Sequence, residues 1–332
     1  MAEKKRRRIA VLKVVIFVLI GVLLFELAHV VLLEKSSYSK YRNWKRIEDV
    51  DILITGNSHA DVGLDPIQLE ESLSQAYGTD IIAFNYAIFG MRMEQLYFFV
   101  KEALKTHVPD MLILETYALC PLLDSERDVL ARRAFDMLPL SRNKIEAINY
   151  CVNEDRWSYY IPLIKYHSRW KQLNREDITL PFDARLSNDA GRTHGAAAPD
   201  ACPDPGDGWF SQDLSRLEAT RAITPTEAEC LENLLALLAE KDIPLVFVSV
   251  PFKIQMGLDS VEMVKINNYL REHYVDDARV FMLDMNRMWS ELDIDYTDLF
   301  NEGHLNASGA NKATNCLADY LAANPQILAR NY

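Results

Sequence analysis

The sequence has 332 residues, 49% of them hydrophobic, so the chain can bury a full globular core. Its formal net charge is −12, and because residues 1–13 carry a net +5, the remainder carries −17. Such an acidic body argues against nucleic acid or an anionic lipid surface as its main ligand.

The N-terminal segment differs from the rest of the chain. Residues 1–8 are basic, and residues 9–33 are apolar except for Lys13, Glu26 and His29. About 20 apolar residues suffice to cross a bilayer as a helix. A cleaved signal peptide is the alternative, but no small-residue cleavage site follows the apolar core. We therefore expect a single-pass cell-membrane anchor, with the basic tail in the cytoplasm and the main domain outside it.

The chain after the anchor has two parts. Residues 34–48 are polar and aromatic, which suggests a stalk, and residues 49–332 form one α/β domain. Apolar runs alternate with amphipathic helices, a pattern typical of a parallel sheet covered on both faces. The predicted fold is a three-layer sandwich around five parallel strands, at residues 51–55, 80–85, 110–115, 243–250 and 280–283.

The alternation stops between residues 117 and 223. This block has no comparable apolar strand, and part of it (191–208) is rich in Ala, Pro, Asp and Gly. We interpret it as a large helical insertion that forms a cap over the sheet, with a surface loop inside it. The alternation resumes at 224–241 with a capping box and a helix.

The five cysteines show no C-x-x-C pair and no metal-ligand spacing. We expect them to be mostly buried as apolar side chains, and their pairing is open. The sequence predicts neither a metal nor an organic cofactor.

The first strand ends in Gly56-Asn57-Ser58-His59, which predicts a tight turn into a helix. A serine at this point projects from the carboxyl edge of the sheet, where ligands of open α/β sheets bind. The structural alternative is that Ser58 only caps the helix.

A second polar segment, residues 296–310, precedes the last helix and contains His304. A loop histidine there can reach the same edge of the sheet as Ser58. Nucleophilic catalysis needs a base beside the serine and a third group that orients the base. The chain order Ser, Asp or Asn, His supplies all three, and favours a catalytic triad.

These two segments, Gly56-Asn57-Ser58-His59 and His304-Leu305-Asn306-x-x-Gly309, resemble the first and last blocks of the SGNH (GDSL-like) hydrolases. More narrowly, the chain resembles the membrane-anchored branch that includes the teichoic acid D-alanyl transfer protein and the alginate acetylation proteins. The resemblance implies an SGNH/flavodoxin-like fold, with Ser58 as nucleophile and His304 as general base. It also implies action beside a membrane-bound O-acyltransferase.

The sequence departs from the family pattern at the acid. The family's acid stands three residues before the histidine, and that residue here is Asn301. An asparagine can hold an imidazole but cannot stabilise its positive charge, and the equivalent change in a serine protease costs about 10⁴ in rate. Our hypothesis is that Asp298 acts as the acid instead.

The second departure concerns the oxyanion hole. The resemblance implies donors from the nucleophile's own N–H, a glycine after the second strand and an asparagine after the third. Gly90 and Asn85 are the candidates near the second strand, but no asparagine follows the third. Losing one such donor typically costs about 10²–10³ in kcat.

Four further residues are candidates for substrate binding. His59 could line the acyl pocket beside the nucleophile. An aromatic face and a guanidinium suit sugars or acyl-phosphate groups, which favours His167, Arg169 and Trp170, although packing within the insertion is the alternative.

We therefore predict an extracytoplasmic acyltransferase or esterase that acts on O-acyl groups, acetyl first, of a cell-envelope polysaccharide or teichoic acid. The alternative is a catalytically inactive SGNH-like module that binds glycan or scaffolds an acyltransferase complex.

Overall fold

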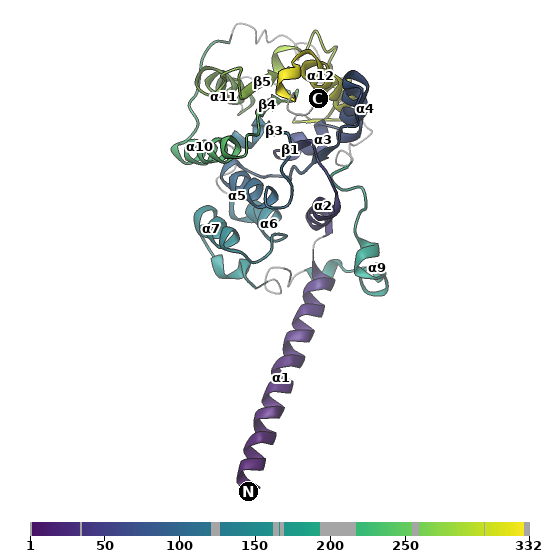
Figure 1. Ribbon diagram of the computed structural model, residues 1–332, viewed down its shortest axis with the longest axis vertical. Helices are drawn as coiled ribbons and strands as arrows, with labels where there is room; N and C mark the ends of the chain where they lie inside the picture. The colour runs from purple at the N-terminus through teal and green to yellow at the C-terminus, as the bar shows by residue number, and fades with distance from the viewer. Residues whose placement is uncertain are drawn as a thin grey trace.

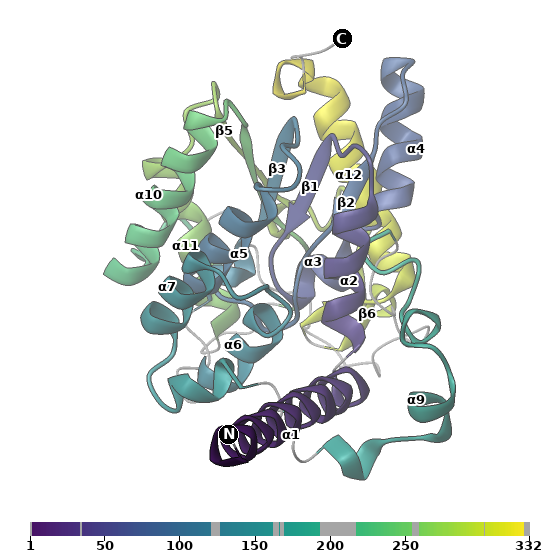
Figure 2. The same cartoon turned by 60° about the horizontal axis from the view of Figure 1, so that its bottom comes forward.

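The computed structural model describes residues 2–33, 35–120, 127–161, 166, 169–192, 217–253, 259–301 and 303–328. The predicted α/β class and all five predicted strands are confirmed. The strands form one parallel sheet in the order β2-β1-β3-β4-β5 (Figure 2). Their bounds are β1 Ile52–Thr55, β2 Ala83–Asn85, β3 Met111–Glu115, β4 Leu245–Ser249 and β5 Val280–Asp284.

Each face of the sheet is covered by helices. Alternate residues of a strand point to opposite faces, and because both sets are apolar, both faces are buried. Leu53 and Leu112 contribute to one core, while Ile52 and Ile113 contribute to the other. Helices on the first face are α5 Met93–Ala103, α10 Pro225–Glu240 and α11 Asp259–His273. Those on the second are α4 Pro66–Tyr77 and α12 Ala307–Ala323 (Figure 2).

The strand order indicates which edge of the sheet is expected to bind a ligand. The chain moves from β1 outward to β2, then crosses back to β3 on the other side of β1. Such a reversal opens a crevice at the carboxyl ends of the two central strands, where α/β sheets bind ligands. Residues that follow β1 and β3 therefore lie at this crevice.

Helix α1, Ala2–Leu32, projects away from the rest of the molecule (Figure 1). Within its segment Lys4–Leu32, a window of 18 residues has a mean hydropathy of 2.8 and is not buried by other parts of the protein. By length and composition this helix can cross a membrane, in agreement with the predicted apolar anchor.

The predicted stalk is wrong for most of its length. Residues Lys35–Arg46 form helix α2, which packs on the domain. Trp44 is 1% exposed, and its Nε1 donates a hydrogen bond to the carbonyl of Ala103 at the end of α5. The helix thus belongs to the folded body, immediately after α1.

The described parts of the predicted insertion are mostly helical. Helices α6 Arg127–Phe135 and α7 Arg142–Cys151 pack against α5 and extend that layer. Helix α9, Arg175–Thr179, lies instead beside the domain end of α1 (Figure 1). Residues 193–216, with most of the predicted loop, fall outside the described residues.

The cysteines of the described residues are free thiols in buried positions, as expected for apolar packing, at Cys120, Cys151, Cys230 and Cys316. Cys202 falls outside the described residues.

Candidate active site

The turn after β1 is built for Ser58. Gly56 has a φ of +148°, and a Cβ there would lie 2.8 Å from the Cβ of Glu115 on the neighbouring strand. Only glycine avoids both the strained backbone and this clash. Asn57 is the N-cap of the short helix α3, Ser58–Gly63, and its side chain accepts the N–H of His59. The cap is therefore Asn57, which leaves the Ser58 hydroxyl available.

The Ser58 hydroxyl contacts the histidine predicted from the far end of the chain. His304 lies on β7, His304–Leu305, which pairs with β6, Leu299–Asn301, in a small antiparallel ribbon. The distance from Ser58 Oγ to His304 Nε2 is 2.7 Å. Ser58 is 7% exposed. A nucleophile and a base separated by 246 residues thus meet at the carboxyl edge of the sheet.

Asn301 holds the other ring nitrogen of His304. Its Oδ1 is 3.0 Å from His304 Nδ1, and it also accepts the backbone N–H groups of Gly303 and His304 at 2.9 and 3.0 Å. The two backbone donors fix which amide atom faces the ring, since an NH₂ group cannot accept them. His304 therefore carries its proton on Nδ1 and leaves Nε2 as acceptor for the serine hydroxyl, the tautomer that a general base requires.

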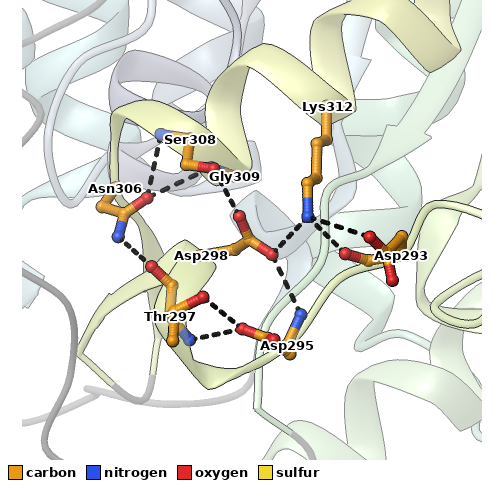
Figure 3. A network of polar contacts seen from close by, with 8 residues as sticks. All are labelled: Asp293, Asp295, Thr297, Asp298, Asn306, Ser308, Gly309 and Lys312. Atoms are coloured by element: carbon orange, nitrogen blue, oxygen red, sulfur yellow. Dashed lines mark hydrogen bonds and ion pairs between the residues drawn. The ribbon is translucent and has the colours of Figure 1, made fainter.

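The hypothesis that Asp298 orients His304 is wrong. The Asp298 carboxylate accepts Ser308 Oγ at 2.6 Å, Lys312 Nζ at 2.8 Å and the Asp295 N–H at 3.0 Å (Figure 3). It is 1% exposed and joins the loop before β6 to the start of α12. Asp298 is thus a structural carboxylate, and Asn301 occupies the place of the acid.

Burial sets the protonation of both histidines at the site. It lowers the pKa of His304 below the usual value, and the nearby Asp61 carboxylate partly offsets this effect. The pKa of His59 lies well below its usual value, first because of burial and then because of the charge on His304. Both rings are therefore neutral near pH 7, as a general base must be.

His59 lines the site as part of an aromatic wall. Its ring stacks on Tyr117 with centroids 3.8 Å apart, and lies 4.8 Å from the ring of His304. Phe89 stacks parallel to His304 from another element, with centroids 6.3 Å apart. The sequence analysis did not predict a role for Tyr117 or Phe89, although they lie two and four residues after the ends of β3 and β2.

Of the two residues predicted for the oxyanion hole, one has its donors occupied and the other remains a candidate. Asn85 is fully buried, and its amide donates to the carbonyls of Ala60 and Leu64 at 2.8 and 3.0 Å. Its donors are used to hold α3, so the prediction of Asn85 as an oxyanion donor is wrong. Gly90 remains a candidate: it follows Phe89 in a turn closed by the Met91 N–H, with φ +75°.

We expect Asn85→Ala to destabilise the fold by about 2–4 kcal/mol, because two buried carbonyls lose their donors. Denaturant unfolding of the detergent-solubilised protein measures this effect. A side chain whose amide served only a bound ligand would instead leave the free energy of unfolding unchanged when it is replaced.

Glu115 is the last residue of β3, the strand after which the sequence has no asparagine. Its side chain is fully buried at the end of β3, directly behind Gly56. Oε1 accepts the Tyr117 N–H at 3.1 Å, while Oε2 has no hydrogen-bond partner among the described residues. Burial raises the pKa of Glu115 to about 8. A neutral carboxylic acid thus underlies the nucleophile turn.

The remaining predicted residues do not join this site. The Arg169 guanidinium donates to the carbonyl of Leu33 at the end of α1, and Trp170 is 63% exposed. His167 falls outside the described residues. Across the described ranges, no group of three or more His, Cys, Asp or Glu side chains could hold a metal ion.

The site contains the elements of serine-based acyl chemistry: a buried hydroxyl, a neutral histidine in the required tautomer, and a group that orients this histidine. A scan of the sequence against models of protein families finds no match, and neither does a search of curated protein sequences.

Proposed function

We propose that the protein is an SGNH-type serine O-acyltransferase or esterase that acts outside the cytoplasm on a cell-envelope polysaccharide or teichoic acid. The observation that carries the proposal is the 2.7 Å hydrogen bond between Ser58 Oγ and His304 Nε2. The Asn301 amide supports it by fixing the tautomer of His304.

In the first step, Ser58 Oγ attacks the carbonyl carbon of an acyl donor while His304 Nε2 takes the hydroxyl proton. The donor's carbonyl oxygen becomes an oxyanion, for which the backbone N–H groups of Ser58 and Gly90 are the candidate donors. Collapse of the intermediate breaks the bond to the leaving group, which receives the proton from His304. Ser58 is then acylated.

In the second step, a hydroxyl group attacks the acyl-serine and gives its proton to His304. The product is an acylated glycan if a sugar hydroxyl attacks, and a free acid if water attacks. Whether water is excluded at this step decides between transferase and esterase. Acetyl is the first acyl group to test.

A helix that can cross a membrane supports an envelope substrate. The basic residues in the first two turns of α1 favour a cytoplasmic N-terminus, which would place α2 and the domain outside. In this position the protein would work beside a membrane-bound O-acyltransferase, which would supply acyl groups across the bilayer.

A second candidate function is a non-catalytic glycan-binding or scaffold module. Asn301 favours this candidate, because it leaves a developing imidazolium without a negative partner. The two functions differ in whether Ser58 becomes covalently acylated.

We expect a fluorophosphonate probe to label the detergent-solubilised protein, because His304 activates the Ser58 hydroxyl. Ser58→Ala should abolish the label and reduce hydrolysis of 4-nitrophenyl acetate by at least about 10⁴-fold. Ser187→Ala, at an exposed serine, is the matched control and should retain both signals. Labelling that persists in Ser58→Ala, or that never occurs in the wild type, would favour the scaffold.

A further inference from the structure

A pocket lies on the side of the domain that carries α2, and its lining includes Phe89 and Asp61, which also act on His304. Its volume is about 310 Å³. It lies between α2, the segment after β2 and helix α6, and its lining consists of Ser37, Lys40, Asp61, Ala87, Ile88, Phe89 and Arg133.

Two of the lining residues connect this pocket to the chemistry. Phe89 stacks on the ring of His304 with an interplanar angle of 14°. Asp61 lies on α3 three residues after Ser58, and its charge is felt by His304. A molecule seated in the pocket would therefore extend from α2 toward the Ser58 hydroxyl.

The charges in the pocket do not cancel. Lys40 Nζ is bonded to the Asp61 carboxylate and to the carbonyl of Ala87 at 2.8 Å, so these two charges neutralise each other. Arg133 lies over the face of Phe89, its guanidinium carbon 4.7 Å from the ring centroid. Among the described residues no carboxylate pairs with this guanidinium. Its planar edge remains as a donor for a carboxylate or phosphate.

This local positive charge stands out because the chain beyond residue 13 carries a net −17. A freely diffusing polyanion is repelled by such a body, so a polyanionic substrate needs a cationic contact at the point of reaction. Arg133 provides one over Phe89, the ring that also stacks on His304.

We infer that this pocket binds an anionic group of the acyl acceptor, a carboxylate or a phosphate, and thereby presents a neighbouring hydroxyl to Ser58. The inference rests on the proposed function, and it narrows the acceptor to a polymer with a negative charge close to the acylated hydroxyl. Arg133 is the residue that contacts the anion, and Phe89 holds its guanidinium in place.

The test measures binding without chemistry. Full-length protein in detergent, with Ser58→Ala as the background, is titrated by calorimetry at low salt with three probes of similar length: oligogalacturonate, oligo(glycerol phosphate) and a neutral malto-oligosaccharide. We expect an anionic probe to bind and the neutral probe not to bind, and the better anion identifies the carboxylate or phosphate source.

Arg133→Gln should weaken binding of that anion roughly tenfold or more, the effect of losing a charge-assisted hydrogen bond. Arg133→Lys should restore part of the affinity. Arg142→Gln, at a side chain that is 93% exposed, is the matched control and should bind as the background does. Equal binding of all three probes, or equal affinities for Arg133→Gln and Arg142→Gln, would overturn the inference.

These outcomes are separable from those for the proposed function. If the protein binds the anion through Arg133 but shows no ester cleavage that depends on Ser58, the proposed function is contradicted and the anion-binding role of the pocket is supported. Ester cleavage without anion binding contradicts only the pocket.

Discussion

Asn301→Asp should raise kcat for ester cleavage by roughly 10- to 1000-fold. A carboxylate within hydrogen-bond distance typically favours an imidazolium by 1–3 pKa units, and the same free energy is gained when His304 becomes charged in the transition state. The gain is smaller than the 10⁴ associated with the reverse change in a serine protease, because the wrong tautomer contributes to that loss. Here Asn301 Oδ1 already selects the right tautomer.

The pH dependence of the same variant gives a second readout. In the wild type, burial lowers the pKa of His304, so kcat/KM should hold to below pH 6.5 before His304 is protonated and activity falls. In Asn301→Asp, the pH at which kcat/KM falls should rise by about 1–3 pH units. The constant kcat/KM reached above that pH should rise as well. Stopped assays with 4-nitrophenyl acetate from pH 4.5 to 8.5 measure both quantities.

The double variant Asn301→Asp, His304→Gln is the control, since a carboxylate without its imidazole should bring no gain. If Asn301→Asp changes neither the kcat/KM at high pH nor the pH at which kcat/KM falls, the role assigned to Asn301 is contradicted. That result would also favour the scaffold function.

Most of the fold was predictable because its signals are local. Each strand of the sheet is a short apolar run, and the parallel arrangement follows from the helices between the runs. The positions of Ser58 and His304 follow from the same pattern, because the chain after each parallel strand emerges at one edge of the sheet. Both side chains were therefore expected at this edge, and there they form a hydrogen bond of 2.7 Å.

Helix α2 shows a signal that was present but misinterpreted. Its composition is polar, which suggested a stalk, yet its aromatic residues Tyr38, Tyr41 and Trp44 recur every three residues. This spacing places them on one helical face. Trp44 is buried in the core, with Tyr38 and Tyr41 packed against it. Periodicity, rather than composition, was the informative property.

The choice between Asp298 and Asn301 depends on long-range geometry. The β6-β7 ribbon has an irregular register between Leu299 and Asn301, and it returns the chain so that Asn301 faces His304. Asp298 is meanwhile held by Lys312, one turn into α12 beyond Ser308. No sequence spacing reports which of two nearby polar residues such a bulge turns inward. Asn85 was misassigned for a similar reason, since its partners lie 21 and 25 residues away.

Glu115 connects the stability of the fold to the nucleophile turn. The folded protein keeps the Glu115 proton up to a pKa of about 8, whereas the unfolded chain releases it near the ordinary pKa of 4.5. Between these values the folded state binds more protons than the unfolded state, so the free energy of unfolding falls as pH rises. Integrated over the interval, the loss is about 4–5 kcal/mol.

Glu115→Gln should remove this pH dependence, because the amide is neutral at every pH and its oxygen can still accept the Tyr117 N–H. The variant should match the wild type in Tm near pH 5 and exceed it at pH 8.5 by on the order of 10 °C. Thermal unfolding of both proteins in the same detergent, from pH 5 to 8.5, measures the difference. Glu232→Gln, at an exposed position on α10, is the control, and its Tm should depend on pH as the wild-type Tm does. If the Tm of Glu115→Gln changes with pH as the wild-type Tm does, Glu115 is ionised in the folded protein. A negative charge then lies behind Gly56, next to the place where the proposed mechanism forms an oxyanion.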